Sequence, residues 1–136
     1  MPLHLEIVTP EARTFSGEVD TVVVPGVEGE AGLLPGHAPL VSAIQPGELS
    51  YVSKGESHHL AIGEGFVEIS NDRVSVITDL AIGDADIDEG AVEEALSRAE
   101  AAIKDKDVGD EDYAATQAAI AKSMAQLNLK RRRKRV

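Results

Sequence analysis

Three aspartates at alternate positions, Asp84, Asp86 and Asp88, come closer to a metal-binding pattern than any other residues of this chain. Calcium loops open with carboxylates at this spacing, but they also require glycine at the sixth position and glutamate at the twelfth. Here those two positions hold Glu89 and Ala95. We therefore interpret the aspartates as acidic residues at the N-terminus of a helix, where they complement the helix dipole.

The histidines and glycines do not form a recognisable chemical site either. His58 and His59 are adjacent in a predicted strand, so their side chains point to opposite faces and cannot easily share a zinc ion. The segment 63–65, Gly-Glu-Gly, is followed by Phe66 and not by a third glycine that opens a helix. The chain has no cysteine, no Gly-Lys-Ser/Thr and no Gly-x-Ser-x-Gly elbow. We predict no catalytic site, no metal and no cofactor.

Composition and charge limit the kinds of molecule that this chain can bind. Hydrophobic residues make up 43% of the 136 residues and aromatic residues only 3%, so the core must consist of Val, Ile, Leu and Ala. Six of the 13 Lys and Arg residues lie in one run, 130–135; without that run, 24 acidic residues face 7 basic ones, a balance of −17. Such a body should repel nucleic acid. We find no apolar run of roughly 20 residues and no targeting pattern at the N-terminus, and we expect a soluble protein.

The hydrophobic pattern before Gly83 is typical of short strands. Leu3, Leu5 and Ile7 alternate with other residues, and two hairpins are expected, with turns at Lys54-Gly55 and Asn71-Asp72. Three Pro-Gly pairs predict tight turns in which glycine supplies a positive φ: Pro25-Gly26, Pro35-Gly36 and Pro46-Gly47. Eight or more short strands at this spacing predict an antiparallel β-sandwich or barrel over residues 1–83.

After Gly83 the hydrophobic period becomes that of a helix. Asp88 is the expected N-cap, and a stripe from Val92 to Ile103 marks the first helix. The second helix should begin near Asp110, with these residues on its inner face: Tyr113, Gln117, Ile120, Met124 and Leu127. Because both helices are rich in alanine, they bury little apolar area, and we expect a mobile hairpin. The predicted fold is α+β, an antiparallel β-sandwich (1–83) followed by an α-helical hairpin (84–136).

Several motifs together resemble one family. The stretch 29–40 reads Gly-Glu-Ala-Gly-Leu-Leu-Pro-Gly-His-Ala-Pro-Leu, and 46–49 reads Pro-Gly-Glu-Leu. With the opening segment 6–11, these residues resemble the signature of the epsilon subunit of rotary F-type ATP synthases. Segments 109–114, 120–122 and 125–127 are similar to the second C-terminal helix of that family. The resemblance covers nearly the whole chain and respects the change from strands to helices.

The resemblance implies a non-catalytic subunit of the central stalk of a bacterial-type, proton-translocating ATP synthase. In the family, the sandwich binds the gamma subunit and sits on the rotor ring. The helical hairpin either folds down on the sandwich or extends beside gamma to the alpha and beta subunits of the catalytic head, where it inhibits ATP hydrolysis. The implied location is peripheral, on the cytoplasmic face of the bacterial cell membrane, with membrane contact only through the complex.

The family positions suggest two groups of partner-binding residues. The group implied for gamma and the rotor ring is Glu28, Gly29, Glu30, His37, Ala38, Pro39 and Leu40. The group suited to acidic surface on the catalytic head is Lys122, Lys130, Arg131, Arg132, Arg133, Lys134 and Arg135. Two simpler interpretations stay open. His37 could be a turn histidine bonded to backbone, and the basic tail could oppose the helix dipole.

Some family members bind ATP through a pattern of Ile or Leu, Asp, two free positions, Arg and Ala. The matching stretch here is 111–116, in which Asp112 is present but Ala115 stands in place of the arginine. An arginine makes a forked contact with phosphate that alanine cannot replace, so we predict weak or undetectable ATP binding. The alternative function is an unrelated adaptor, whose exposed strand edge accepts a partner's strand.

Overall fold

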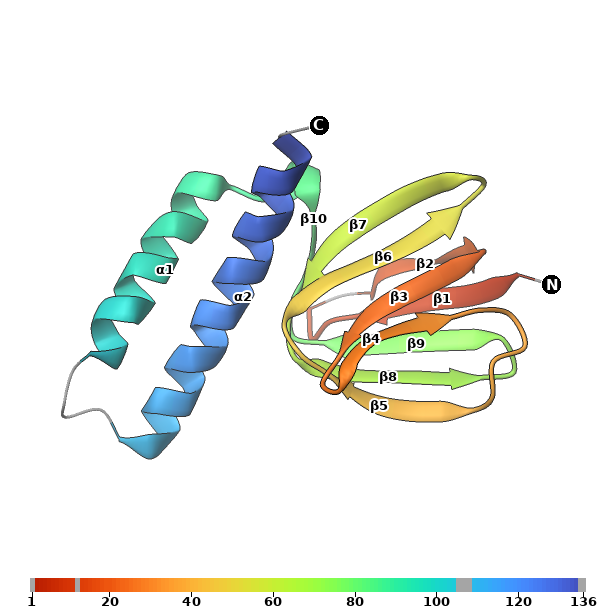
Figure 1. The fold of residues 1–136 in the computed structure, drawn as a ribbon, viewed down its shortest axis with the longest axis horizontal. Helices are drawn as coiled ribbons and strands as arrows, with labels where there is room; N and C mark the ends of the chain where they lie inside the picture. The colour runs from red at the N-terminus through yellow and green to blue at the C-terminus, as the bar shows by residue number, and fades with distance from the viewer. Residues whose placement is uncertain (1, 12, 105–108, 135–136) are drawn as a thin grey trace.

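The computed structural model describes residues 2–11, 13–104 and 109–134. Ten strands and two long helices form two separate parts, with the helices packed at one side of the sheet (Figure 1). The strands are β1 (Leu3–Val8), β2 (Arg13–Val19), β3 (Thr21–Gly26), β4 (Gly29–Leu33), β5 (Leu40–Ile44), β6 (Gly47–Ser53), β7 (Glu56–Ile62), β8 (Gly65–Ser70), β9 (Arg73–Thr78) and β10 (Ala81–Gly83). A 3₁₀ turn, η1 (Asp84–Asp86), leads into α1 (Glu89–Ile103) and α2 (Asp110–Lys134).

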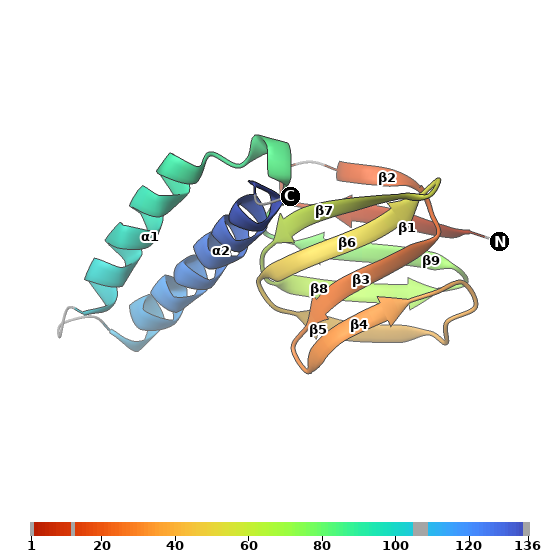
Figure 2. The ribbon, with the colours of Figure 1, turned by 45° about the horizontal axis from the view of Figure 1, so that its top comes forward.

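The strands form one sheet that folds over into two layers (Figure 2). The order is β10-β7-β6-β3-β5-β8-β9-β1-β2, with β4 paired to the other side of β3. A single pair, Gly26 with Ile44, joins β3 of one layer to β5 of the other. The predicted α+β fold, a sandwich followed by a helical hairpin, is confirmed. One pairing differs, because β1 and β9 run parallel. Alternating hydrophobicity cannot predict this, since it is the same in both strand directions.

The core between the two layers consists of aliphatic side chains. Its buried members are Leu3, Leu5, Ile7, Val19, Val22, Val24, Leu33, Ile44, Leu49, Ile62, Val67, Ile69, Val74 and Val76. Two aromatic rings, Phe15 and Tyr51, lie at its margin with their centroids 4.7 Å apart. The alternation of β1 is the clearest case, because Leu3, Leu5 and Ile7 are completely buried.

The structure confirms some of the predicted turns and contradicts others. Both predicted hairpins form, and Lys54, Gly55, Asn71 and Asp72 all have positive φ, as two-residue hairpin turns of type I′ require. Of the three Pro-Gly pairs, however, only Pro35-Gly36 has a glycine with positive φ, at 83°.

In the other two Pro-Gly pairs the glycine belongs to a strand and has no positive φ, so the prediction of a positive-φ turn glycine there is wrong. Gly26 ends β3 and Gly47 begins β6. What these positions require is space. A Cβ on Gly26 would meet the carbonyl oxygen of Gly29 at 2.6 Å, and a Cβ on Gly47 would meet Cβ of Pro25 at 2.8 Å. At each of these two positions, the absence of a side chain allows another segment of the chain to approach closely.

The helical hairpin begins as predicted. Asp88 is the N-cap of α1, and its Oδ1 accepts a hydrogen bond from the backbone N–H of Ala91 at 3.1 Å. Along the predicted stripe of α1, Val92 is buried and Leu96 half-buried, but Ala95 is exposed.

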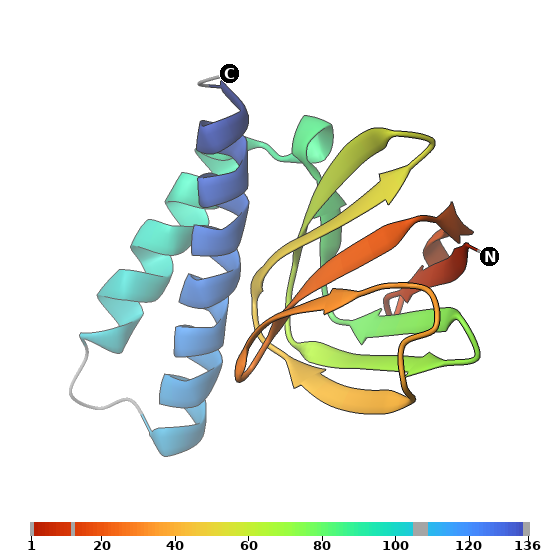
Figure 3. The same ribbon diagram turned by 45° about the vertical axis from the view of Figure 1, so that its right-hand side comes forward.

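The predicted inner face of α2 is largely wrong. Leu127 is buried and Ile120 half-buried, but Gln117 is exposed, and Tyr113 and Met124 are 45% and 44% exposed. The buried side chains are instead Ser123, Ala125, Leu127 and Leu129, all in the C-terminal half. The reason is that α2 lies between α1 and strands β6 and β7 (Figure 3). Our prediction assumed a single seam between two helices, whereas this half of α2 is covered on two sides.

Candidate partner-binding surfaces

The residues implied for gamma and the rotor ring fall into two groups at opposite ends of β4 (Figure 2). Glu28 lies in the β3–β4 turn, and Gly29 and Glu30 begin β4. The segment 37–39 lies in the β4–β5 loop, and Leu40 begins β5. The structure therefore does not bring the seven residues together in one patch.

The β4–β5 loop is held by hydrogen bonds to its neighbours. The backbone N–H of Gly36 donates to Oδ1 of Asp72 in the β8–β9 turn at 2.7 Å, and that of His37 donates to the carbonyl of Leu34 at 3.1 Å. His37 is half-buried, and its Nδ1 lies 2.7 Å from the carbonyl oxygen of Ala38. The interpretation of His37 as a turn histidine bonded to backbone therefore matches its geometry.

A surface that our sequence analysis missed lies on the outer face of β5, β8 and β9. Phe66 and Ile77 are direct cross-strand neighbours, and they are 59% and 55% exposed. Ala43 pairs with Phe66 on one side, and Val8 of β1 pairs with Ile77 on the other, so an apolar row crosses four strands. We call this row, together with Val41 (67% exposed) and Val27, the apolar stripe.

The apolar stripe had a signal in the sequence. Phe66 precedes buried Val67, and Ile77 follows buried Val76. Two successive apolar residues in a strand point to opposite faces, so one of each pair must lie on the outer face. A surface hollow of about 520 Å³ lies beside Phe66 and is lined partly by Val27 and Ala43, so the surface of the stripe is not flat. An exposed apolar patch of this kind is typical of a protein–protein interface.

The described basic side chains of α2 contact carboxylates or a backbone carbonyl of the chain itself. Nζ of Lys122 lies 2.7 Å from Oδ2 of Asp79, in the β9–β10 connection. Nζ of Lys130 donates to the backbone carbonyl of Asp84 at 3.1 Å. Arg133 and Lys134 continue the backbone of α2, and Arg135 lies outside the described residues.

Arg131 and Arg132 of α2 each donate two hydrogen bonds to carboxylates. Arg131 donates to Glu89 at 3.1 Å and to Glu93 at 2.5 Å, both on α1. Both terminal nitrogens of Arg132 donate hydrogen bonds to the carboxylate of Glu48 in β6, and Nη1 lies 2.6 Å from Oε2. These hydrogen bonds, which Arg131 donates to Glu93 and Glu89 and Arg132 donates to Glu48, raise the pKa of each guanidinium. Both arginines therefore stay charged.

The two adjacent histidines have different partners. Nδ1 of His59 lies 2.8 Å from Oε1 of Glu48, whereas the ring of His58 stacks on Tyr51 with a centroid distance of 4.8 Å. Among the described residues, no three His, Asp or Glu side chains are placed to hold a metal ion together.

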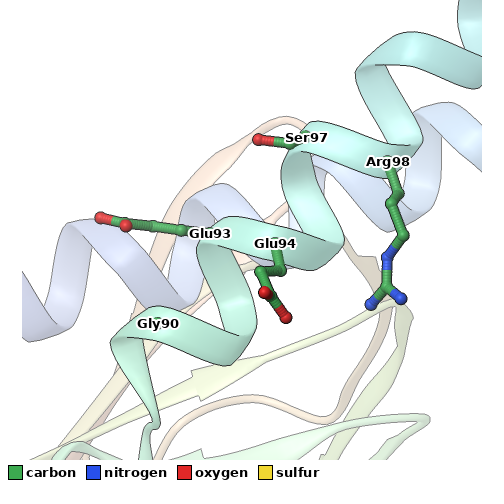
Figure 4. Close-up of a pocket in the computed structure, with 5 residues that line it drawn as sticks. All are labelled: Gly90, Glu93, Glu94, Ser97 and Arg98. Carbon is green, nitrogen blue, oxygen red and sulfur yellow. The ribbon is translucent and has the colours of Figure 1, made fainter.

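A hollow of about 490 Å³ lies along α1 (Figure 4). Its lining includes Glu93, Glu94 and Arg98, and the last two extend to the same side of the helix. Two carboxylates against one guanidinium disfavour an anionic nucleotide. Asp112 and Ala115 are exposed on α2. Weak ATP binding stays a prediction.

Comparison with known proteins agrees with the two-part architecture. Residues 2–84 match the family model of the beta-sandwich domain of the ATP synthase delta/epsilon chain, and residues 85–131 match the model of the long alpha-helix domain of the same chain. The fold and these matches define the class as the delta/epsilon chains of ATP synthases.

Individual relatives narrow this class. The ATP synthase epsilon chain of Herpetosiphon aurantiacus is 42% identical over 134 residues, which is 98% of each chain. That of Dehalococcoides mccartyi is 43% identical and covers 98% of this chain and 95% of its own. This chain belongs to the family of ATP synthase epsilon chains, which are subunits of the central stalk of F-type ATP synthases. The alternative of an unrelated adaptor is thereby excluded.

Solved structures of distant relatives share the fold. A chain of the Euglena gracilis mitochondrial ATP synthase (OSCP/F1/c-ring) is 22% identical with a TM-score of 0.79, and covers 93% of this chain and 79% of its own. A chain of the Tetrahymena thermophila mitochondrial ATP synthase (central stalk/c-ring) is 12% identical with a TM-score of 0.58, and covers 98% and 96%. Within the described residues, neither helix has the length and apolar character needed to cross a bilayer.

Proposed function

We propose that this chain couples rotation of the central stalk to ATP synthesis and restrains ATP hydrolysis, with no catalytic site of its own. Its partners are the gamma subunit, the rotor-ring subunits and the alpha and beta subunits of the catalytic head. It works at the cytoplasmic face of a bacterial cell membrane, in a proton-translocating complex. Sequence identity above 40% with bacterial epsilon chains over nearly the full length supports this assignment.

The apolar stripe is the observation that carries the proposal for gamma. Phe66, Ile77 and Val41 are large side chains that the fold leaves more than half exposed. Covering a side chain of this size contributes about 1.5–3 kcal/mol, and aromatic residues dominate the energy of many interfaces. A partner that covers the stripe therefore gains a compact apolar anchor on a rigid sheet.

The two ends of β4 suit different partners. The segment 37–40 leads directly into β5, which carries Val41, so it extends the apolar stripe. We assign it to gamma. At the other end, Glu28 lies in the exposed β3–β4 turn and Glu30 near the start of β4, and their charges suit a polar loop of the rotor ring. The two groups can then contact different subunits at the same time.

The helical hairpin provides the restraint on hydrolysis. In the structure it is packed on the sandwich. We assign this arrangement to the state in which the hairpin is withdrawn from the catalytic head. When it extends, the basic residues of α2 face acidic surface on the head. A helix pair with few buried side chains can leave one surface for another at small net cost, which makes a two-state element.

The test of the gamma-binding surface is the substitution Phe66→Ser. Because Phe66 is largely exposed, we expect the variant to fold normally and to bind isolated gamma at least tenfold more weakly, measured by calorimetry. Tyr113→Ser is the matched control, since it removes an exposed aromatic ring from α2. Unchanged affinity of the Phe66 variant for gamma would contradict the assignment.

A further inference from the structure

The helical hairpin is attached to the sandwich by a small apolar cluster that is separate from the main core. Its buried members are Ala61 of β7, Ile87 and Val92 at the start of α1, and Leu127 and Leu129 of α2. Half-buried Ile82 and Leu96 complete it. So few side chains bury a small area, and the apolar contribution to docking is correspondingly limited.

Ion pairs reinforce this attachment along the same half of α2. Lys122 and Arg132 are ten positions apart, about 15 Å along a helix, and they bind Asp79 and Glu48 of the sandwich. Between them, Lys130 reaches the carbonyl of Asp84, and Arg131 joins α2 to α1. All four basic side chains described on α2 are therefore engaged within the chain.

We propose that Lys122 and Arg132 form an ionic latch that holds the hairpin on the sandwich, while Lys130 and Arg131 brace the hairpin itself. These four cations bind either the chain's own acceptors or an acidic partner surface, never both. The latch deepens the proposed function, because the second state requires the catalytic head as that surface. Its contribution comes from partly exposed pairs that act together, with the two-pronged Arg132–Glu48 contact as its anchor.

The sign of the salt effect follows from the exposure of these pairs. Arg131 and Arg132 are about half exposed, so dissolved ions screen their attraction to the glutamates. Raising the salt concentration therefore loosens the docked hairpin. The apolar cluster has no such dependence at moderate salt, so a salt-sensitive opening of the hairpin reports the latch.

Two substitutions on the acidic side isolate the latch. Glu48→Gln and Asp79→Asn remove two anions of the sandwich but leave every cation of α2 available to a partner. Glu56→Gln is the control, because Glu56 is an exposed acid on β7 whose substitution changes the charge as much as either single substitution, at the opposite end of that strand from the hairpin. None of the three positions lies on the apolar stripe.

The readout is hydrogen exchange in the full chain at low and high salt, followed at the amides of Leu127 and Leu129. Exchange detects opening of the hairpin even when the open form is rare. We expect exchange to be about fivefold faster in the double variant at low salt, and its salt dependence to be reduced. The control should match the parent. Equal rates and equal salt response in the double variant and the parent would overturn the latch.

A second measurement separates the latch from the proposed function. ATP hydrolysis by the assembled enzyme should be inhibited more strongly by the double variant, because its hairpin opens more readily while its cations are intact. Faster exchange with unchanged inhibition would leave the latch standing and reject the catalytic head as the competing surface. Unchanged exchange would reject the latch whatever the inhibition.

Discussion

Gly65 shows how a single residue shapes the apolar stripe. It pairs with Thr78 at the start of β8, next to Phe66. A Cβ at this position would collide with the carbonyl oxygen of Ile77 and would lie 2.8 Å from Cα of Thr78. Both obstacles belong to the backbone, which cannot move aside as the end of a flexible side chain can. The absence of a side chain here lets β8 and β9 meet closely beneath the stripe.

We therefore expect Gly65→Ala to lower the free energy of unfolding by about 1–3 kcal/mol, because the strands must separate to admit the methyl group. Gly32→Ala is the control, since no atom would lie within 4 Å of the added Cβ in β4. Its effect should be about 0.5 kcal/mol or less. Urea unfolding followed by circular dichroism measures both. Equal stability of the two variants would show that the sheet absorbs the clash.

At the scale of elements, α2 carries both of the hairpin's proposed interactions. Its C-terminal half is buried between α1 and strands β6 and β7, and the same turns of helix display the basic residues. The docked and the extended arrangement therefore compete for one segment. Shortening α2 removes cations from both states, whereas substitution of Glu48 leaves every cation of α2 in place.

A chain that ends at Leu129 should inhibit ATP hydrolysis less than the intact chain at low salt. Truncation removes residues 130–136, and with them the six basic charges of 130–135 that attract acidic surface on the catalytic head. Because salt screens this attraction, the difference should fade as salt rises. Hydrolysis by assembled enzyme across a salt series measures it. Equal inhibition at every salt concentration would remove charge on the tail as a cause.

At the scale of the whole molecule, the described residues form two apolar cores of unequal size. The larger lies between the layers of the sandwich and ends at Val76, and the smaller joins β7 to the hairpin. Only Ala61 and Ile82 of the sandwich belong to the smaller cluster. The sandwich therefore has a complete core without the hairpin, whereas the buried residues of the hairpin pack partly against the sandwich.

Residues 1–83 should accordingly fold alone and bind gamma with the affinity of the full chain. Removal of the hairpin uncovers Ala61 and Ile82 but leaves the larger core and the apolar stripe intact. Circular dichroism tests the fold of this fragment, and calorimetry tests its affinity for gamma. An unfolded fragment, or a folded one that does not bind gamma, would contradict the division into two independent parts.

Much of the fold was predictable from the sequence because its signals are local. Alternation in β1, the Lys54-Gly55 and Asn71-Asp72 turns and the Asp88 cap each depend on residues a few positions apart. The change of period near Gly83 marked the boundary between strands and helices for the same reason. These signals, with the family motifs, were enough to predict the α+β fold and the epsilon family.

Only the tertiary structure decided which surfaces of these elements are exposed and which other segments of the chain they contact. Arg132 and Glu48 are 84 positions apart, and nothing local to either residue indicates the other. The parallel pairing of β1 with β9, the close approaches at Gly26 and Gly47, and the exposed side of α2 also arise between distant segments. Contacts of this kind depend on how the whole chain folds back on itself, and periodicity and turn chemistry, which act between neighbours, do not encode them.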